Sequence, residues 1–162
     1  AFLRALGPEP FDVDGPGLAD RLAGRRGPLK SVLLDQRVVA GLGNIYVDEI
    51  LHRAGIHPRH EADRLLRREF DVLAAAMHEV LTAAIESGGS TIRDYRSPSG
   101  RAGDFTARHR VFGRDGTPCP DCGHPVRKIR LAGRGTHFCP ACQPRRRRRP
   151  RRRVARVKGE RT

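Results

Sequence analysis

The chain has no run that approaches the roughly 18–20 consecutive apolar residues of a membrane-spanning helix. This absence argues against the membrane-spanning class, and we expect no membrane partner. The first residues, Ala1 to Arg4, lack the basic-then-apolar order of a secretory signal, so we expect the protein in the cytoplasm. Lysine is also scarce: Lys30, Lys128 and Lys158 are the only three, and nearly all of the positive charge is arginine. The length of 162 residues fits one medium domain or two small ones.

Acidic residues are almost missing from the C-terminal end. Residues 144–162 contain eleven arginines and lysines against one acid, Glu160, so this tail carries +10 of the formal net charge of +14. The total charge indicates a polyanionic partner, but the body needs its own argument for binding nucleic acid. We expect the low-complexity tail to be disordered. It either adds salt-sensitive, non-specific DNA affinity or has no selected role.

Cysteine is absent from the first 118 residues, and the four that follow form two pairs, Cys119-Pro-Asp-Cys122 and Cys139-Pro-Ala-Cys142. Two C-x2-C pairs separated by sixteen residues predict a closed structural zinc site made by these four thiolates. Such a site has no open position for a catalytic water, so its zinc does no chemistry. The alternatives are a redox or disulfide role, or His124 or His137 replacing one cysteine.

The residues between the pairs predict a β-hairpin. Val126 to Leu131 alternates as a strand does, and Arg134 follows between two glycines, at the expected hairpin tip. A guanidinium in that position can hold a phosphate bidentately, although a solvated turn arginine is the alternative. About thirty residues cannot bury a sufficient core alone. We therefore expect the metal to supply the folding free energy, on the order of 10–16 kcal/mol.

The residues before the hairpin predict helices packed around one small core. The expected helices are residues 17–23, 28–34, 45–53 and 65–85, with a polar loop over 97–103. Asn44 is expected to cap the third helix, with Asp48 and Glu49 in its first turns and Gly55 just after its end. The predicted fold class is mainly α with a small zinc-bound β-hairpin.

The turn before the third helix, Gly41-Leu42-Gly43-Asn44, has the composition of an anion site. Two glycines before a helix N-terminus let backbone N–H groups approach a phosphate, and the helix dipole favours the negative charge. Asn44 could cap the helix, contact the phosphate, or do both. Ordinary turn and cap chemistry is the alternative, because a Gly-x-Gly turn is common.

Several motifs, in the same order, resemble the formamidopyrimidine-DNA glycosylase family. The run from Asp35 to Glu49 resembles its helix–two-turn–helix signature, and His57-Pro58 follows it. Residues 88–95 resemble the family's segment after its long helix. Residues 111–119 and 133–143 are similar to the two halves of its zinc finger. The resemblance extends from about Leu6 to Gln143.

The resemblance implies a division of the chain and a function. Residues 1–16 would be an interdomain linker, 17–95 a helix–two-turn–helix DNA-binding domain, 96–110 a lesion-capping-type loop and linker, 111–143 the zinc finger, and 144–162 the tail. The implied activity is that of a bifunctional glycosylase and abasic-site lyase, which removes oxidised purines such as 8-oxoguanine and formamidopyrimidine. The implied partner is duplex DNA with an oxidised base or an abasic site, at the bacterial nucleoid, and we expect a monomer.

The resemblance also assigns roles to particular residues. Asn44 and Arg134 would grip the phosphates around the flipped nucleotide, and Arg134 would have a catalytic role in the late elimination step. Lys30, Arg26, Tyr46 and Gly43 would complete the DNA-binding set. Extruding a base costs a few kcal/mol, and phosphate contacts on both sides offset that cost.

One part of the family pattern is not found in this sequence. The family's nucleophile is an N-terminal proline amine followed by a glutamate, with a lysine in the same β-rich domain, and none of these matches residues here. We therefore expect the chain to be the DNA-binding half, inactive alone and partnered by an N-terminal catalytic domain. The alternative is a stand-alone, non-catalytic damaged-DNA-binding module. An RNA-binding zinc-ribbon protein is a weaker alternative, because it leaves the motif from Gly41 to Tyr46 unexplained.

Overall fold

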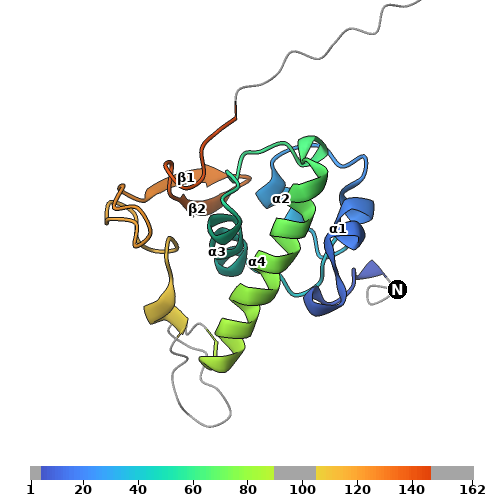
Figure 1. Cartoon of the computed structure of the whole chain (residues 1–162), viewed down its shortest axis with the longest axis horizontal. Coiled ribbons are helices and arrows are strands. Elements are labelled where there is room, and N and C mark those ends of the chain that lie inside the picture. The colour runs from blue at the N-terminus through green and yellow to red at the C-terminus, as the bar shows by residue number, and fades with distance from the viewer. Residues whose placement is uncertain (1–4, 90–104, 147–162) are drawn as a thin grey trace, which may run out of the picture.

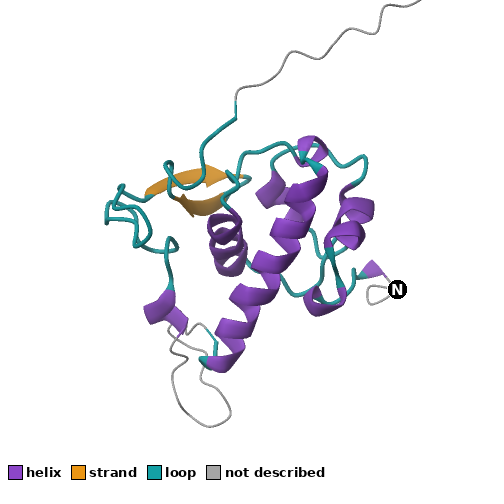
Figure 2. Cartoon of the chain, in the orientation of Figure 1, coloured by secondary structure: helices purple, strands orange, loops and turns teal. Residues whose placement is uncertain are grey.

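Helices surround a single long helix, and one small sheet lies beside them (Figures 1 and 2). This computed structural model describes residues 5–89 and 105–146. Its elements, in chain order, are η2 (Pro10–Asp12), α1 (Gly15–Leu22), α2 (Leu29–Leu33), α3 (Asn44–Ala54), η3 (Ala62–Arg64), α4 (Arg67–Glu86), η4 (Phe105–Arg108), β1 (Arg127–Leu131) and β2 (Arg134–Phe138). The predicted class, mainly α with a two-stranded hairpin beside four clustered cysteines, is confirmed.

The long helix α4 organises the hydrophobic core. It packs against α1 and α3, and its apolar positions recur at helical spacing, so that Leu73, Ala74 and Met77 point inward together. At its N-terminus the Glu69 carboxylate accepts the Leu66 N–H at 2.8 Å. In the last turn Ala84 is still buried, whereas Ile85 is 69% exposed.

Residues that precede α1 pack onto the helices. Val13 is part of the core, the Gly7 N–H donates to the Gln36 carbonyl, and the Ala40 N–H donates to the Pro8 carbonyl. Helix α1 begins at Gly15, two residues earlier than expected, because the Asp14 side chain caps it by accepting the Gly17 N–H at 2.8 Å. The expected loop over 97–103 lies outside the described residues, and the division into domains stays a prediction.

The hairpin turn differs in one respect from the expectation. Strands β1 and β2 are antiparallel, with Leu131 opposite Arg134 and Arg127 opposite Phe138. The two turn residues are Ala132 and Gly133, both in the left-handed region with φ of 49° and 75°, as a two-residue turn of the tight primed type requires. Arg134 is therefore the first residue of β2, next to the tip rather than at it.

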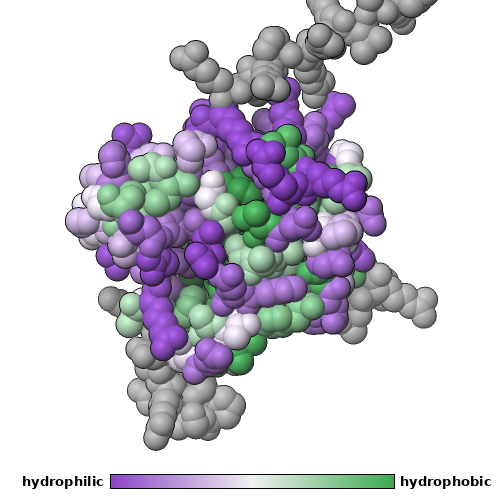
Figure 3. All heavy atoms as spheres, viewed as in Figure 1, coloured by the Kyte–Doolittle hydropathy of each residue, from purple (hydrophilic) through white to green (hydrophobic). Residues whose placement is uncertain are grey.

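The face of the molecule drawn in Figure 3 is mostly hydrophilic, with apolar side chains showing mainly toward its middle. Within residues 5–89 and 105–146, no helix combines the length and the apolarity that crossing a bilayer requires. The long α4 is instead a core helix, with Leu73, Ala74 and Met77 in the buried cluster.

Candidate nucleic-acid interface and zinc centre

The four cysteines converge on one point. The Sγ atoms of Cys119 and Cys142 are 3.9 Å apart, and those of Cys122 and Cys139 are 3.4 Å apart. All four sulfurs lie within 4.8 Å of one another. A tetrahedral site with Zn–S bonds of about 2.3 Å has sulfurs about 3.8 Å apart, so the spacing fits zinc. These cysteines form the site of one structural zinc ion.

The chemistry of the four thiols also fits a cation. Burial raises the pKa of the Cys142 thiol, and hydrogen bonds with Cys122, Cys139 and Cys119 raise it further. Thiols crowded in this way do not ionise together without a positive charge at their centre, and zinc supplies that charge.

The Glu49 carboxylate attaches the entry of the finger to α3. It is buried and accepts backbone N–H groups from Arg110, Val111 and Phe112 at 2.9, 3.0 and 2.9 Å. A carboxylate with three N–H partners satisfies both of its oxygens in a site closed to water. Glu49 therefore determines where the finger begins relative to α3.

The neighbouring Asp48 attaches the hairpin to α3. Its Oδ2 accepts the backbone N–H of His137 in β2 at 2.9 Å, and its Oδ1 lies 2.7 Å from Nζ of Lys30. Both side chains of this ion pair are almost completely buried. Burial lowers the pKa of Lys30, and the Asp48 carboxylate opposes that shift.

Lys30 extends this network to the hairpin turn. Its ammonium donates to the Gly135 carbonyl at 3.0 Å and to Oγ1 of Thr136 at 2.8 Å, besides its pair with Asp48. The three N–H donors of the ammonium thus each have a partner inside the protein. The sequence predicts that Lys30 contacts DNA. With only 1% exposure, however, Lys30 does not present its charge at the surface. It positions the strand that carries Arg134.

Asn44 and the hairpin turn meet at the same carbonyl. The Asn44 Nδ2 donates to the Gly135 carbonyl at 3.1 Å, so this oxygen accepts from both Asn44 and Lys30. Asn44 is not the helix cap that was expected: Gly43 has that position, and Asn44 is the first residue of α3. The structure thus joins the N-terminus of α3 to the residue that follows the exposed Arg134.

The glycine turn before α3 is held by one side chain. Gln36 accepts the Gly41 N–H through its Oε1 at 2.8 Å and donates from Nε2 to the Leu42 carbonyl at 3.0 Å. Gly41 needs to be glycine because its φ is 80°, whereas Gly43 is extended. The first N–H groups of α3 have no acceptor within the helix itself and lie at its N-terminal end beside Asn44.

The other residues predicted from the sequence to contact DNA differ in exposure and position. Gly43 and Arg26 are exposed, the latter in the connection between α1 and α2. Tyr46 is half-buried, and its ring packs against Phe105 with centroids 5.6 Å apart. The structure therefore brings Asn44, Lys30 and the neighbours of Arg134 together directly. Arg26 lies on a separate loop.

Sequence reasoning missed the residues that join finger and helices. From the sequence, Asp48 and Glu49 are only acids in the first turns of a helix, whereas in the structure their carboxylates accept backbone N–H groups of the finger. Gln143 was missed as well: its Oε1 accepts the Cys139 N–H at 2.9 Å, and its Nε2 donates to the Ile56 carbonyl at 3.0 Å. The available signals were polar residues in positions that a fold tends to bury. Asp48 and Glu49 lie among the apolar residues of a short helix, and Gln143 directly follows a cysteine pair, so each needs a polar partner.

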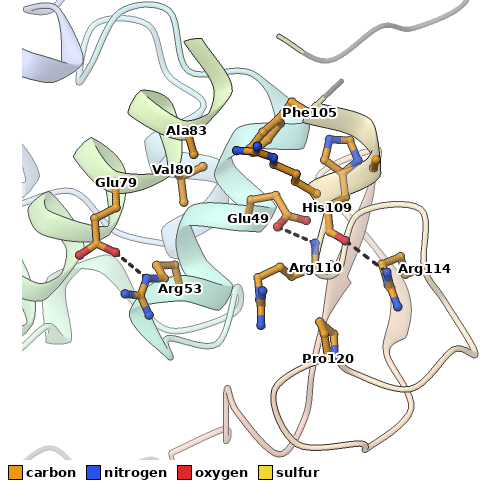
Figure 4. Close-up of a pocket in the computed structure, with 12 residues that line it drawn as sticks. Glu49, Arg53, Glu79, Val80, Ala83, Phe105, His109, Arg110, Arg114 and Pro120 are labelled. Atoms are coloured by element: carbon orange, nitrogen blue, oxygen red, sulfur yellow. Dashed lines mark hydrogen bonds and ion pairs between the residues drawn. The ribbon is translucent and has the colours of Figure 1, made fainter. Parts of the chain in front are cut away.

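A pocket of about 430 Å³ lies beyond Glu49, between α3, α4, η4 and the finger (Figure 4). Val80, Ala83 and Phe105 form its apolar wall. Arg53 crosses its edge toward Glu79, with Nε 2.6 Å from the carboxylate. The pocket lies further along α3 than Asn44, and none of the DNA contacts predicted from the sequence lines it.

Comparison with known proteins agrees with this architecture. Residues 6–96 match the profile of the formamidopyrimidine-DNA glycosylase H2TH domain, and residues 116–145 match that of a zinc finger found in FPG and IleRS. Formamidopyrimidine-DNA glycosylase of Gluconobacter oxydans is 52% identical over 88% of this chain and 53% of its own length. The chain thus spans about half the length of the curated relatives that it matches.

Solved structures give the same result. The MutM (Fpg) protein of Thermus thermophilus superposes with a TM-score of 0.82 at 51% identity, over 87% of this chain and 55% of that one. A complex of Lactococcus lactis Fpg with DNA that contains an abasic site superposes with a TM-score of 0.81 at 41% identity, over 89% and 54%. By both its helical domain and its zinc finger, the chain belongs to the formamidopyrimidine-DNA glycosylase family.

Proposed function

We propose that this chain clamps damaged duplex DNA as the DNA-binding half of a base-excision glycosylase and abasic-site lyase. The observation that carries the proposal is the Gly135 carbonyl, which accepts hydrogen bonds from both Asn44 and Lys30. The Asn44 bond joins the N-terminal end of α3, and the Lys30 bond joins α2, to the strand residue beside Arg134. Two phosphate-binding elements are thereby held in a fixed relation.

Each element has the chemistry of a phosphate contact. The first-turn N–H groups of α3 attract an anion through the helix dipole, and the exposed Arg134 guanidinium can bind a phosphate bidentately. Contacts of this kind fix the register of the duplex and offset the few kcal/mol that base extrusion costs. Gly43, Tyr46 and Arg26 would extend the contact surface. The buried Lys30 would contribute indirectly, by positioning the hairpin.

The proposed substrates follow from family membership and from the DNA complexes of relatives. Lactococcus lactis Fpg has been solved in complex with Fapy-dG-containing DNA and with abasic-site-containing DNA. We extend this to oxidised purines for the present chain, with Arg134 acting in the elimination step as well as in binding. DNA at the bacterial nucleoid would be the place of action, and one copy of the chain would suffice to form both elements of the clamp.

The experiment that tests the clamp compares two arginines of the same hairpin. The chain is titrated onto a duplex carrying a tetrahydrofuran abasic analogue and onto the undamaged duplex. Arg134→Ala should weaken binding to the abasic duplex by about 1–3 kcal/mol, the scale of a lost charge-assisted contact. Arg127→Ala, at the far end of β1, is the control with the same charge change. Equal losses for both variants would mean that Arg134 contributes only general positive charge.

A second experiment separates binding from chemistry. We assign no nucleophile among these 162 residues, and a Schiff-base mechanism needs a free amine at the sugar C1′. With abasic DNA and borohydride, the chain alone should bind without forming a trapped adduct. A robust adduct through Ala1 would show that these residues perform the chemistry unaided. Restored trapping when an N-terminal catalytic domain is added would favour the enzyme over a stand-alone binding module.

A further inference from the structure

His52 lies against the zinc site from the side of α3. Its ring is 4% exposed, and its Nε2 is 3.5 Å from Sγ of Cys119 and 3.5 Å from Oδ2 of Asp121. The ligand atoms of these three residues all lie within 4.8 Å of one another. His52 therefore approaches one of the four zinc thiolates from outside the cysteine quartet.

The two ring nitrogens of His52 have unequal surroundings. Its Nδ1 is buried and has no hydrogen-bond partner among the described residues, which is unfavourable for a polar atom closed to water. A phenyl ring would fill the same space without this cost. What the imidazole offers in return is the Nε2–H group, which points to Cys119 and Asp121.

Asp121 is itself held in place from the finger. The Arg110 side chain forms an ion pair with Asp121, with Nε 3.2 Å from Oδ2. The Arg110 backbone N–H donates to Glu49 on α3 (Figure 4). His52 follows Glu49 by one turn of α3, so both ends of this chain of contacts begin on the same helix. The contacts run from Glu49 on α3 through Arg110 and Asp121 to His52, which is again on α3.

We propose that His52 is a positioning residue of the zinc site, which donates a hydrogen bond to the Cys119 thiolate while Asp121 and Arg110 hold it in register. It is not a ligand, since the four cysteines already complete the tetrahedron. The bond reduces the negative charge on one sulfur of a four-thiolate site and ties that sulfur to α3. Outer-shell partners of this kind change metal affinity by about 10–100-fold. The proposal is independent of the DNA-binding function.

The experiment uses the full chain loaded with zinc or with cobalt. His52→Phe keeps the buried aromatic volume and removes the donor, whereas His52→Gln keeps a donor. His78→Phe is the matched control, because the His78 ring on α4 also has a hydrogen-bonding Nε2, 3.0 Å from the Pro10 carbonyl, and is remote from the cysteines. Zinc affinity is measured by competition with a chromophoric chelator. The thiolate-to-cobalt charge-transfer band reports the sulfur environment directly.

We expect His52→Phe to bind zinc about 10–100-fold more weakly and to shift the charge-transfer band to lower energy. His52→Gln should fall between this variant and the wild type, and His78→Phe should match the wild type in both measurements. A weaker site with an unshifted band would mean that His52 acts through packing alone, which overturns the proposal. Unchanged zinc affinity in His52→Phe would overturn it too. A wild-type cobalt spectrum with a nitrogen ligand would make His52 a ligand instead.

Discussion

The helical part and the zinc finger are held together by different forces. In the helical part, eighteen buried apolar residues form one continuous cluster. The finger's own cluster has four buried residues, Val111, Cys119, Val126 and Cys139, and two of these are metal ligands. Burial of apolar area can stabilise the first region by itself, whereas the second is too small for that.

The finger compensates through polar contacts with the helical part, most of them with α3. Glu49 accepts three backbone N–H groups of the finger entry, and Asp48 binds β2. Gln143 connects the second cysteine pair to Ile56, just after α3. Helix α3 therefore belongs to both regions. Its apolar face completes the core, and its acidic residues hold the finger in the position that the proposed DNA clamp requires.

Removing zinc should give the largest effect, and it should separate the two regions. A structural zinc contributes about 10–16 kcal/mol of apparent free energy, and the finger has no core to replace it. After chelation, amide signals of the finger should collapse to unfolded positions, while those of α1, α3 and α4 remain dispersed. Heteronuclear NMR on the zinc-loaded and chelated chain measures this. Loss of both regions together would show one cooperative unit instead of two.

Replacing Asp48 by Asn should cost the most among single substitutions at the junction. The change leaves the buried Lys30 ammonium without its counter-charge, and removal of one partner from a buried pair costs about 3–5 kcal/mol. Denaturant unfolding of the zinc-loaded chain measures the loss.

The surface pair of Arg53 and Glu79 provides the control for Asp48. Both of its side chains are more than half exposed, so Glu79→Gln should cost about 1 kcal/mol or less. The double variant Lys30→Met/Asp48→Leu should recover part of the stability, because it removes both charges. If Asp48→Asn were as mild as Glu79→Gln, the buried pair would not be what joins hairpin and helix.

A core substitution should act on the helical part alone. Leu73 in α4 is 1% exposed, and Leu73→Ala should lower the free energy of unfolding by about 2–5 kcal/mol through lost burial and a cavity. Zinc affinity should stay unchanged. The neighbouring Val72 is 46% exposed, so Val72→Ala should change stability by about 0.5 kcal/mol or less. A large change in zinc affinity with Leu73→Ala would contradict the separation of the two regions.

The same division explains what could be predicted from sequence. The cysteine quartet, the helical spacing of α4 and the Gly55 helix end depend on residues close in the chain, and the structure contains all three. The junction depends on pairs far apart, such as Lys30 with Gly135, which are separated by 105 residues. Nothing local marks Lys30 as buried, since its charge normally implies a surface position. Distant partners also determine the roles of Asp48, Glu49 and Gln143.

The smallest expected effect is a pH dependence at the boundary between the two regions. His57 follows α3, is buried, and packs edge-on against Phe138 of β2 with centroids 4.7 Å apart. Burial lowers the pKa of His57 to about 4, and the nearby Arg145, Arg59 and His60 act in the same direction. In the unfolded chain this pKa is about 6.5. The folded state therefore favours the neutral ring, and its advantage is complete above the unfolded pKa and is lost as the pH falls toward 4.

Between pH 7 and pH 5.5, this linkage should cost the wild type about 1 kcal/mol of unfolding free energy. His57→Phe keeps a ring against Phe138 and has no proton to bind, so its stability should decline less over the same interval. Denaturant unfolding at the two pH values, with zinc in excess, measures the difference between the slopes. Because thiolate protonation affects both proteins equally, it cancels in this difference. Parallel slopes would show that acid acts on the finger through the cysteines alone, and that His57 does not couple the two regions.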